Sequence, residues 1–341
     1  MAKPPTIKQI AEHLGLSLMT VSRALRDGIS VAPEIRERVR IMARSLGYQT
    51  DARVSDVMSA LRKSEVPQYR EHLAFIWTPS FADQMAENSS FSEVLEGARR
   101  RAFLLGYQLE KFHLAASGLA GRKLSELLHS RGIRGVLIAP NPGRSGFRLG
   151  LDWSQFCCVL VGSSPGTEGV VCIEHDQYFG CIMAVRKLKR AGYQRLGLVT
   201  SRAMDRLTVR LIRSAFISFH PLGPEEAKKL IFISDRYRPK QLDQWLKQAK
   251  PQALLAQFED TFPRKEQLLA HAPPGIGLAT LNWTAADPEV AGVNQHHAKI
   301  GEMAVNLLLE RLQQGTRFGL DPMATSIKIP GAWVAANRVI P

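Results

Sequence analysis

Residues 6–25 read TIKQIAEHLGLSLMTVSRAL, and this stretch determines the fold predicted for the start of the chain. Gly15 is placed to end a first helix, because glycine readily takes the left-handed conformation that closes a helix. Ser17 is placed to cap a second helix with its hydroxyl oxygen. Two short helices joined by a three-residue turn that contains glycine predict a helix-turn-helix. The apolar residues that recur at helical spacing on the two buried faces are Ile7, Ile10, Ala11, Leu14, Val21, Ala24 and Leu25.

A third helix is predicted from Pro33 onward. Proline fits the first helical position, and Glu34 favours the positive end of the helix dipole. One side of this helix is apolar and would pack on the other two helices, while the other side is basic. By periodicity alone, residues 1–50 fit a three-helix interaction module as well as a DNA-binding one. The apolar residues are Ile35, Val39, Met42 and Leu46, and the basic ones are Arg36, Arg38, Arg40 and Arg44.

The chain has 341 residues, too many for a single core, so two or three domains are expected. Lys and Arg number 45 against 31 Asp and Glu, which gives a formal net charge of +14. This surplus favours an anionic partner such as nucleic acid, although basic charge also serves solubility. The chain has no apolar run long enough for a membrane span, and its N-terminus has no secretory signal pattern. The four cysteines lack metal-ligand spacing, so a reduced, cytoplasmic protein with no metal or cofactor is predicted.

The pattern changes after residue 50. Residues 51–70 hold few large core residues and predict a linker with one amphipathic hinge helix. From residue 71 to 341, short apolar runs alternate with helical segments, which predicts an α/β core of two Rossmann-like lobes with parallel sheets. The lobes are predicted to change over near residue 190 and to enclose a ligand cleft at the carboxyl ends of their strands.

The helical segments predicted in this core are 91–105, 121–130, 177–191, 240–249 and a last helix, Ala298–Gln314. The predicted strands are Leu73–Trp77, Tyr107–Phe112, Gly135–Ala139, Cys157–Val161, Val170–Ile173, Leu196–Thr200, Leu230–Ile233, Ala253–Ala256 and Ile276–Leu281, with a tail strand at Thr325–Ile329.

Three stretches of the N-terminal part carry a family resemblance: the one quoted above, ISVAPEIRERV and SLGY. They strongly resemble the headpiece of the lactose-repressor (LacI/GalR) family. The segments CIEHDQYFGCIMAVRKLKRAGYQRLGLV and GVNQHHAKIGEMAVNLLLERL resemble parts of that family's core. The resemblance implies a headpiece at residues 1–50, a hinge at 51–70 and a periplasmic-binding-protein-like core at 71–341. It also implies a sequence-specific transcriptional repressor controlled by a small molecule, such as a sugar or sugar derivative, bound between the lobes.

The resemblance implies a homodimer on palindromic double-stranded operator DNA, in the cytoplasm at the nucleoid and away from membranes. Leu18 and Met19 hold the positions that vary most with operator sequence, and as apolar residues they suit thymine methyl groups. Arg23 is the residue expected to contact guanine O6 and N7, with a phosphate contact as the alternative. The residues expected to contact phosphate are Thr6, Ser17, Thr20 and Ser22.

The hinge departs from the family pattern, because Gln49-Thr50-Asp51 follows the Gly-Tyr pair where the family has Pro and Asn. Apolar side chains in the predicted hinge helix are candidate wedges that enter the minor groove and unstack a base step. The alternative, which is compatible with the first, is a helix that packs against its counterpart in a dimer. The candidates are Val57, Met58 and Leu61.

Polar residues that follow predicted strands are the candidates for the effector site. Together with an aromatic face they suit a hydroxylated ligand, although each one alone also fits a solvated loop. Ile212 stands where the family has an effector-binding arginine, and Gln257-Phe258-Glu259 replaces an Asn-Asp pair, so either the effector is unusual or small-molecule control has been lost. The candidates are Pro79, Ser80, Asn141, Ser163, Arg206, Arg210, Gln257, Glu259, Asn282 and Trp283.

Two other classes of protein explain less of the sequence than a repressor does. A solute-binding protein of the transport type would explain the core alone and has no use for residues 1–50. An enzyme would need an acid, base or nucleophile constellation, and no G-x-S-x-G, H-E-x-x-H or Walker motif occurs. Adjacent His296 and His297 point about 100° apart on a helix, so they do not form a metal pair. Self-association is expected through the helix Phe91–Leu105.

Overall fold

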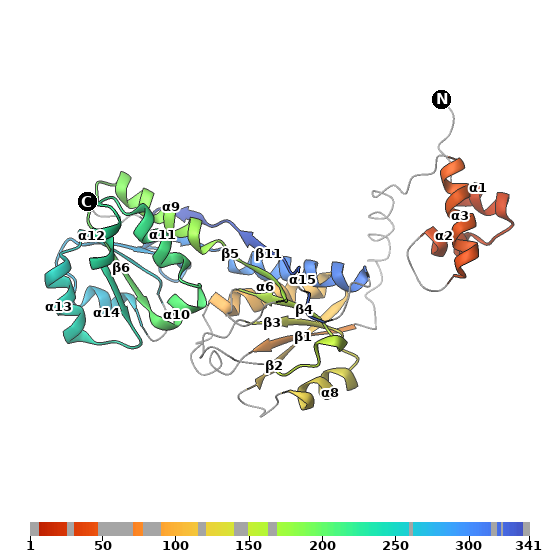
Figure 1. Cartoon of the computed structure of the whole chain (residues 1–341), viewed down its shortest axis with the longest axis horizontal. Helices are drawn as coiled ribbons and strands as arrows, with labels where there is room; N and C mark the ends of the chain where they lie inside the picture. Colours follow the sequence, from red (N-terminus) through yellow and green to blue (C-terminus); the bar gives the residue numbers. More distant parts are fainter. Residues whose placement is uncertain are drawn as a thin grey trace. The chain divides into compact units, whose positions relative to one another are not determined.

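The computed structural model describes residues 7–25, 31–46, 71–77, 90–114, 121–139, 149–162, 169–258, 262–314, 319–321 and 323–336. The chain folds as two units, residues 1–68 and 69–341, called here the headpiece and the core (Figure 1). The predicted hinge, 51–70, lies outside the described residues, so the domain boundaries at 50 and 70 stay predictions. Within the described residues, no helix is long and apolar enough to cross a membrane.

The headpiece has the predicted helix-turn-helix. Helix α1 spans Ile7–Leu14 and α2 spans Leu18–Leu25. Gly15 has φ +64°, its N–H donates to the carbonyl of Glu12, and the N–H of Leu16 donates to the carbonyl of Ala11 at 3.0 Å. These two bonds form a Schellman motif, which closes α1 and turns the chain into α2.

Ser17 caps α2 as its sequence position predicted. Its Oγ accepts the backbone N–H of Thr20 at 3.1 Å, and the two hydroxyl oxygens are 2.8 Å apart. Helix α3, Pro33–Ser45, then packs on both earlier helices. The three helices share a small core of short and β-branched side chains, which lets them approach closely. Its buried members are Ile10, Ala11, Val21, Ala24, Val39 and Ala43.

The first lobe of the core is built on a parallel six-stranded sheet in the order β11-β5-β4-β3-β1-β2 (Figure 1). Alternate residues of β1 face opposite sides: Leu73 and Phe75 join a cluster with α6 and α15, and Ala74 and Ile76 join one with α8. Because helices cover both faces, the central strands β3 and β4 are buried throughout, whereas the edge strands β2 and β11 also carry exposed polar residues. The elements are β1 Glu71–Trp77, α6 Ser90–Leu104, β2 Tyr107–His113, α8 Arg122–Ser130, β3 Gly135–Ile138, η2 Trp153–Gln155, β4 Cys157–Val161, β5 Val171–His175, α15 His297–Gln313 and β11 Ser326–Ile329.

The second lobe repeats this strand order as β12-β10-β9-β8-β6-β7, with β12 antiparallel to its neighbour. One face packs on α9 and α11, and the other on α13 and α14. The elements are α9 Gln177–Arg190, β6 Leu196–Ser201, α10 Arg202–Leu207, α11 Leu211–Phe219, α12 Pro224–Lys229, β7 Ile231–Ser234, α13 Pro239–Ala249, β8 Ala253–Ala256, α14 Lys265–Leu269, β9 Gly277–Thr280, β10 Ala291–Asn294 and β12 Ala332–Val334. The predicted class, a headpiece followed by two α/β lobes, is confirmed.

Two details of the predicted core were wrong. The lobes change over after β5, near Asp176, and not near residue 190, because α9 already packs in the second lobe against α11, β10 and β12. Strands β10 and β12, which are only four and three residues long, were not predicted from the sequence. The tail was expected to supply one strand, but it supplies β11 to the first sheet and β12 to the second.

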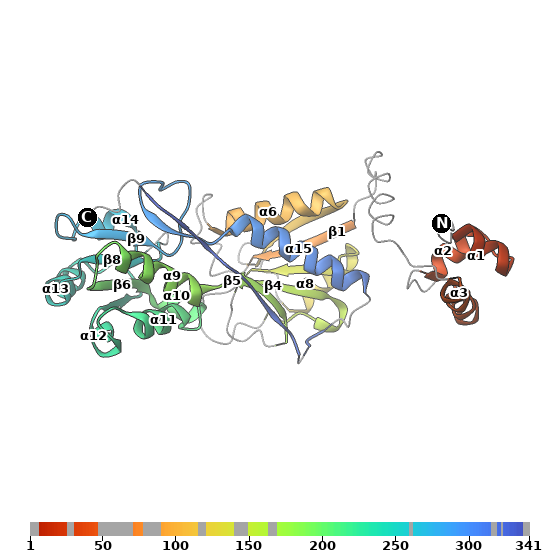
Figure 2. The same ribbon diagram turned by 90° about the horizontal axis from the view of Figure 1, so that it is seen from above.

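Helices α6 and α15 lie side by side on one face of the first sheet (Figures 1 and 2). A Cβ atom placed on Gly97 would lie 2.0 Å from the carbonyl oxygen of Ala298, and one on Gly301 would lie 2.0 Å from that of Val94. Backbone therefore meets backbone at this crossing, and only glycine fits. At one edge of the pair, Arg101 Nε donates to Asn306 Oδ1 at 2.6 Å.

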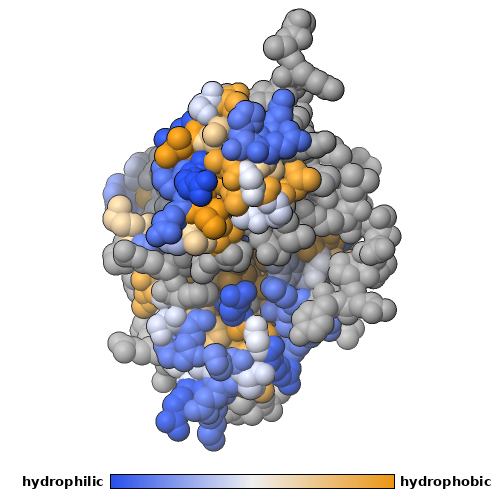
Figure 3. All heavy atoms as spheres, turned by 90° about the vertical axis from the view of Figure 1, so that its right-hand side faces the viewer, coloured by the Kyte–Doolittle hydropathy of each residue, from blue (hydrophilic) through white to orange (hydrophobic). Residues whose placement is uncertain are grey.

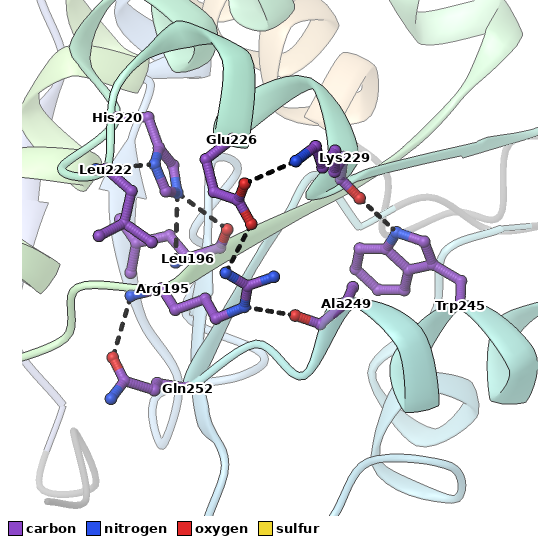
Figure 4. Close-up of polar contacts among 9 residues, drawn as sticks. All are labelled: Arg195, Leu196, His220, Leu222, Glu226, Lys229, Trp245, Ala249 and Gln252. Carbon is purple, nitrogen blue, oxygen red and sulfur yellow. Dashed lines mark hydrogen bonds and ion pairs between the residues drawn. The ribbon is translucent and has the colours of Figure 1, made fainter.

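Arg195 holds the start of β6 to the helices around it (Figure 4). Its Nε donates to the carbonyl of Ala249 at 2.6 Å, and its Nη1 donates to Glu226 at 2.7 Å. Its backbone N–H donates to Gln252 Oε1 at 2.9 Å. Buried His220 lies beside it, with Nε2 3.1 Å from the carbonyl of Leu196. These contacts fix the amino-terminal end of the second sheet, opposite the strand ends that carry the candidate ligand residues.

The α6–α15 crossing predicts a specific loss of stability. Gly301→Ala should lower the free energy of unfolding of the core by about 1–3 kcal/mol or more, because the added methyl group meets backbone. The sign is informative, since Gly→Ala inside a helix otherwise stabilises by roughly 0.5–1 kcal/mol. Urea unfolding followed by circular dichroism measures the change, with exposed Gln313→Ala in the same helix as the control. Wild-type stability of Gly301→Ala would show that the two backbones are not in contact.

Candidate nucleic-acid interface and ligand site

The start of α2 forms the exposed surface of the helix-turn-helix. Leu18, its first residue, is 54% exposed although it is a large apolar residue. Ser17 is exposed beside it, and Thr20 is half-buried, with its hydroxyl against that of Ser17. The backbone of Met19, Ser22 and Arg23 belongs to α2, but their side chains lie outside the described residues, as do Thr6, Val57, Met58 and Leu61.

The headpiece surface is also basic. Arg38 and Arg44 of α3 are exposed, whereas Arg36 is half-buried and donates to the carbonyl of Val31 at 3.4 Å. The face of the molecule in Figure 3 shows hydrophobic side chains interspersed with strongly hydrophilic ones. An exposed leucine beside hydroxyl groups at the start of a helix suits contact with thymine methyl groups and phosphate.

The described effector candidates gather at one edge of the second lobe. Gln257 follows β8, Asn282 and Trp283 follow β9, and Arg206 lies on α10 after β6. These three strands are neighbours and parallel, so their carboxyl ends meet at the same edge of the sheet. Arg206 is exposed, and so is Arg210, which begins α11 with φ +61°. The first-lobe candidates Pro79, Ser80, Asn141 and Ser163, and also Glu259, lie outside the described residues.

Two buried polar atoms at this edge have no partner among the described residues. Gln257 is only 4% exposed, and its Oε1 accepts no hydrogen bond. The indole Nε1 of half-buried Trp283 donates none. Because an unsatisfied buried polar group costs about 1–3 kcal/mol, such atoms mark places where a ligand or water completes the bonding. An acceptor and a donor at the same edge of the sheet fit the hydroxyl groups of a carbohydrate.

In Asn282, by contrast, both the nitrogen and the oxygen of the side-chain amide form hydrogen bonds. Its Nδ2 donates to Ser90 Oγ at 2.6 Å, at the start of α6, and its Oδ1 accepts from His297 Nε2 at 2.7 Å, at the start of α15. The side chain therefore joins the end of a second-lobe strand to two helices of the first lobe. We call Asn282, Ser90 and His297 the interlobe clasp.

A second buried histidine lies where the chain passes between the lobes. His175 Nδ1 donates to the carbonyl of Ile329 at 3.2 Å, and a Cβ atom on Gly180 would lie 2.6 Å from its Nε2. Burial lowers the pKa of His175 to about 4, opposed by Asp176 and assisted by His296 and Lys328. Burial also lowers the pKa of His297 to about 3, with His175 and His296 adding to the effect. Both histidines are neutral at physiological pH.

The sequence analysis did not find Ser90, His175 or His297 as members of a site. Ser90 and Asn282 are 192 residues apart, so their contact leaves no local pattern. The adjacent histidines were correctly placed at a helix start, with His296 preceding α15 and His297 beginning it. The described residues hold no group of three or more side chains that could bind a metal ion.

Comparison with known proteins identifies the headpiece. Residues 6–51 match the family model described as bacterial regulatory proteins, lacI family. The HTH-type transcriptional regulator GntR of Pseudomonas aeruginosa is 27% identical over 208 residues, which cover 60% of this chain and 56% of that regulator. The match thus spans little more than half the length of this relative.

Solved structures show the same fold at lower identity. The transcriptional regulator CelR–cellobiose complex has a TM-score of 0.59 at 18% identity and covers 97% of this chain and 98% of that one. A Lac repressor dimer bound to operator and the anti-inducer ONPF has a TM-score of 0.57 at 16% identity, over 99% and 100% of the two chains. The transcription regulator CcpA of Lactococcus lactis has a TM-score of 0.58 at 15% identity, over 78% and 98%.

A helix-turn-helix headpiece followed by two α/β lobes is thus the architecture that this chain shares with solved transcriptional regulators. Residues 6–51 of the chain match the lacI family of bacterial regulatory proteins, and the fold of the whole chain is similar to that of the Lac repressor. The family resemblance stated from the sequence is confirmed.

The buried histidines predict a loss of stability in acid. The unfolded chain protonates His175 near pH 6.5, whereas the folded chain resists protonation until about pH 4. Neutral His175 therefore makes its full contribution to the free energy of unfolding above pH 6.5. This contribution falls as the pH drops, by about 2 kcal/mol at pH 5. Urea unfolding at pH 7.5 and pH 5 measures it. His175→Asn keeps a donor for Ile329 and should flatten the dependence, whereas exposed His129→Asn should not. An equal pH slope in wild type and His175→Asn would refute the assignment.

Proposed function

We propose that this protein is a sequence-specific transcriptional repressor whose headpiece binds operator DNA and whose core binds a small-molecule effector. The observation that carries the proposal is the lacI-type helix-turn-helix, with α2 capped by Ser17 and its first residues exposed. A solute-binding protein of the transport type would leave this headpiece without a role. No chemical step is assigned to the protein, and its place of action is the cytoplasm, at the nucleoid.

In the proposed complex, α2 enters the major groove. Leu18 and Met19 contact thymine methyl groups, and Arg23 contacts guanine O6 and N7 with its planar fork of donors. The hydroxyl groups and the helix amino-terminus hold the phosphates: if Thr20 donates its proton to Ser17, the Ser17 hydroxyl is free to donate to a phosphate oxygen. Thr6 and Ser22 add phosphate contacts. The wedges proposed for the minor groove are Val57, Met58 and Leu61.

The repressor is proposed to act as a homodimer. A single helix-turn-helix contacts too few base pairs for tight specific binding, and a two-fold pair reads a palindromic operator. Helix α6 offers a surface for this contact, because Phe103 and Leu104 at its end are 56% and 58% exposed. Its opposite side is occupied by α15, so the exposed side is the one available to a second copy.

The effector is proposed to be a sugar or sugar derivative bound at the strand ends of the second lobe. Gln257 would accept a ligand hydroxyl, Trp283 would donate to a ligand oxygen, and Arg206 and Arg210 would add charge at the rim. The cellobiose complex of CelR, a protein of the same fold, supports a carbohydrate. Binding there would change the free energy of the interlobe clasp, which lies next to Trp283, and so shift the balance between core states. First-lobe contacts are proposed from Pro79, Ser80, Asn141 and Ser163, with Glu259 from the second lobe.

DNA binding is tested by a gel-shift titration at two salt concentrations. The protein should bind duplex DNA at low salt and lose about 10³-fold or more in affinity between 50 and 200 mM salt, as phosphate contacts require. On a selected operator, Arg23→Ala should cost about 1–3 kcal/mol and abolish discrimination at one guanine position. Equal weakening on all sequences would make Arg23 a phosphate contact, and no binding at low salt would refute the repressor.

The dimer is tested by sedimentation velocity at micromolar concentration. Phe103→Glu should weaken the dimer by about tenfold or more, because it places a charge in the apolar contact. Lys247, an exposed residue of α13, provides the control, and Lys247→Glu should leave the dimer intact. A stable wild-type monomer would rule the dimer out, and an unaffected Phe103→Glu dimer would place the contact elsewhere.

The effector is tested by thermal-shift screening of the full chain against sugars and sugar acids. A ligand should raise the melting temperature of the core, because it binds only the folded state. It should also change the fluorescence of Trp283. With Gln257→Ala, the affinity of the hit should fall by about tenfold or more, because a buried hydrogen bond is lost. A hit that binds this variant as tightly would show that the ligand lies elsewhere.

A further inference from the structure

Aromatic side chains gather on the outer face of α9 and α11, where half-buried Tyr178 packs on the core and Phe179 and Phe219 are exposed. Tyr178 packs edge-on against Phe179 and against Phe219, with ring centroids 6.0 and 6.2 Å apart. Phe179 is 63% exposed and Phe219 is 39% exposed. A single exposed phenylalanine needs no explanation, but three rings held together at the surface form an organised apolar patch.

The same face is strongly basic at its other end. At 100° per residue, Phe179, Met183, Arg186 and Arg190 fall within about 60° of one another and extend over about 16 Å of α9. The guanidinium of Arg186 lies 5.8 Å from the ring of Phe219, which joins the basic end to the aromatic one. We call the surface formed by Tyr178, Phe179, Met183, Arg186, Arg190 and Phe219 the aromatic–basic face.

The charge of this face is not neutralised by the described part of the core. Helix α9 contains no Asp or Glu, and Arg186, Lys187, Lys189 and Arg190 make no ion pair with a described carboxylate. Other helices are different: Lys228 pairs with Glu225 in α12, and Lys299 pairs with Glu302 in α15. Favourable interaction with the helix dipole explains cations in the last turn of α9. It does not explain their continuity with exposed aromatic rings.

We propose that the aromatic–basic face docks an acidic amphipathic helix of a partner protein. The apolar side of such a helix would cover Phe179 and Phe219, and its carboxylates would pair with Arg186 and Arg190. A second copy of this chain fits poorly, because a symmetric contact would bring the same cations together. Single-stranded nucleic acid also fits poorly, because rings packed at 84° and 83° to each other do not present parallel faces to successive bases.

The test begins with peptide selection on the immobilised full-length protein. Displayed helical peptides of about 15 residues, long enough to cover the face, are selected on wild type and counter-selected on Arg186→Glu/Arg190→Glu. The expected winners combine acidic residues with aromatic or large aliphatic ones. Failure to enrich any peptide over the variant would overturn the proposal.

The best peptide, labelled with a dye, is then titrated against variants by fluorescence anisotropy. Phe179→Ser and Arg186→Glu should each weaken binding about tenfold or more, as anchor residues do. Lys123→Glu on exposed α8 is the matched charge control and should bind as wild type. A peptide with its Glu residues changed to Lys should bind the charge-reversed variant better than wild type. Because Arg186 is exposed, its variant tests the face even if Phe179→Ser folds poorly.

A labelled oligothymidine of about 20 nucleotides is titrated in parallel. It should bind wild type and the charge-reversed α9 variant alike, because its affinity would come from the headpiece. Tight oligothymidine binding that is lost with Phe179→Ser, in the absence of any selected peptide, would assign the face to nucleic acid and overturn the proposal. These outcomes do not depend on the operator or effector, since the face contains no residue of either site.

Discussion

The backbone contact between α6 and α15 is the constraint on which the arrangement of the core depends. Helix α15 follows β10 of the second lobe, yet it packs across the first lobe against α6, with Gly97 and Gly301 at the contact. This close approach fixes where both helices begin. Their first residues, Ser90 and His297, are the two that hold Asn282. The two glycines let the helices pack closely, and this packing places the first residues of both helices within hydrogen-bond distance of Asn282.

The parts of the fold that depend on neighbouring residues could be predicted from the sequence. Gly15 and Ser17 define the turn of the helix-turn-helix through bonds to residues three to five positions away. The apolar runs of β1 to β9 also stand out, because both faces of each sheet are covered. The changeover near Asp176 could not be located, because the apolar side of α9 looks the same whichever lobe it packs on. Strands β10 and β12 are too short for a pattern and exist through their mutual pairing.

The candidate ligand site, too, could be predicted from the sequence only in part. The rule that ligands bind at the carboxyl ends of parallel strands correctly selected Gln257, Asn282 and Trp283 as residues of one edge. The rule could not predict which of their side-chain atoms have hydrogen-bond partners. Asn282 is saturated by two residues of the other lobe, whereas Gln257 and Trp283 keep buried atoms without a described partner. Residues that follow neighbouring strands thus differ in their contacts: Asn282 joins the lobes, whereas Gln257 and Trp283 keep polar atoms that form no hydrogen bond with a described residue.

The tail of the chain has a consequence for how this protein is made. Residues 326–329 complete the first sheet and residues 332–334 complete the second, so a stretch of nine residues supplies an edge strand to each lobe. A ribosome reaches this stretch only after it has made every other described strand of both sheets. Until then both sheets lack one edge strand, whereas α1, α2 and α3 of the headpiece are complete once residue 45 has been added. A nascent chain therefore acquires its helix-turn-helix long before either lobe is whole.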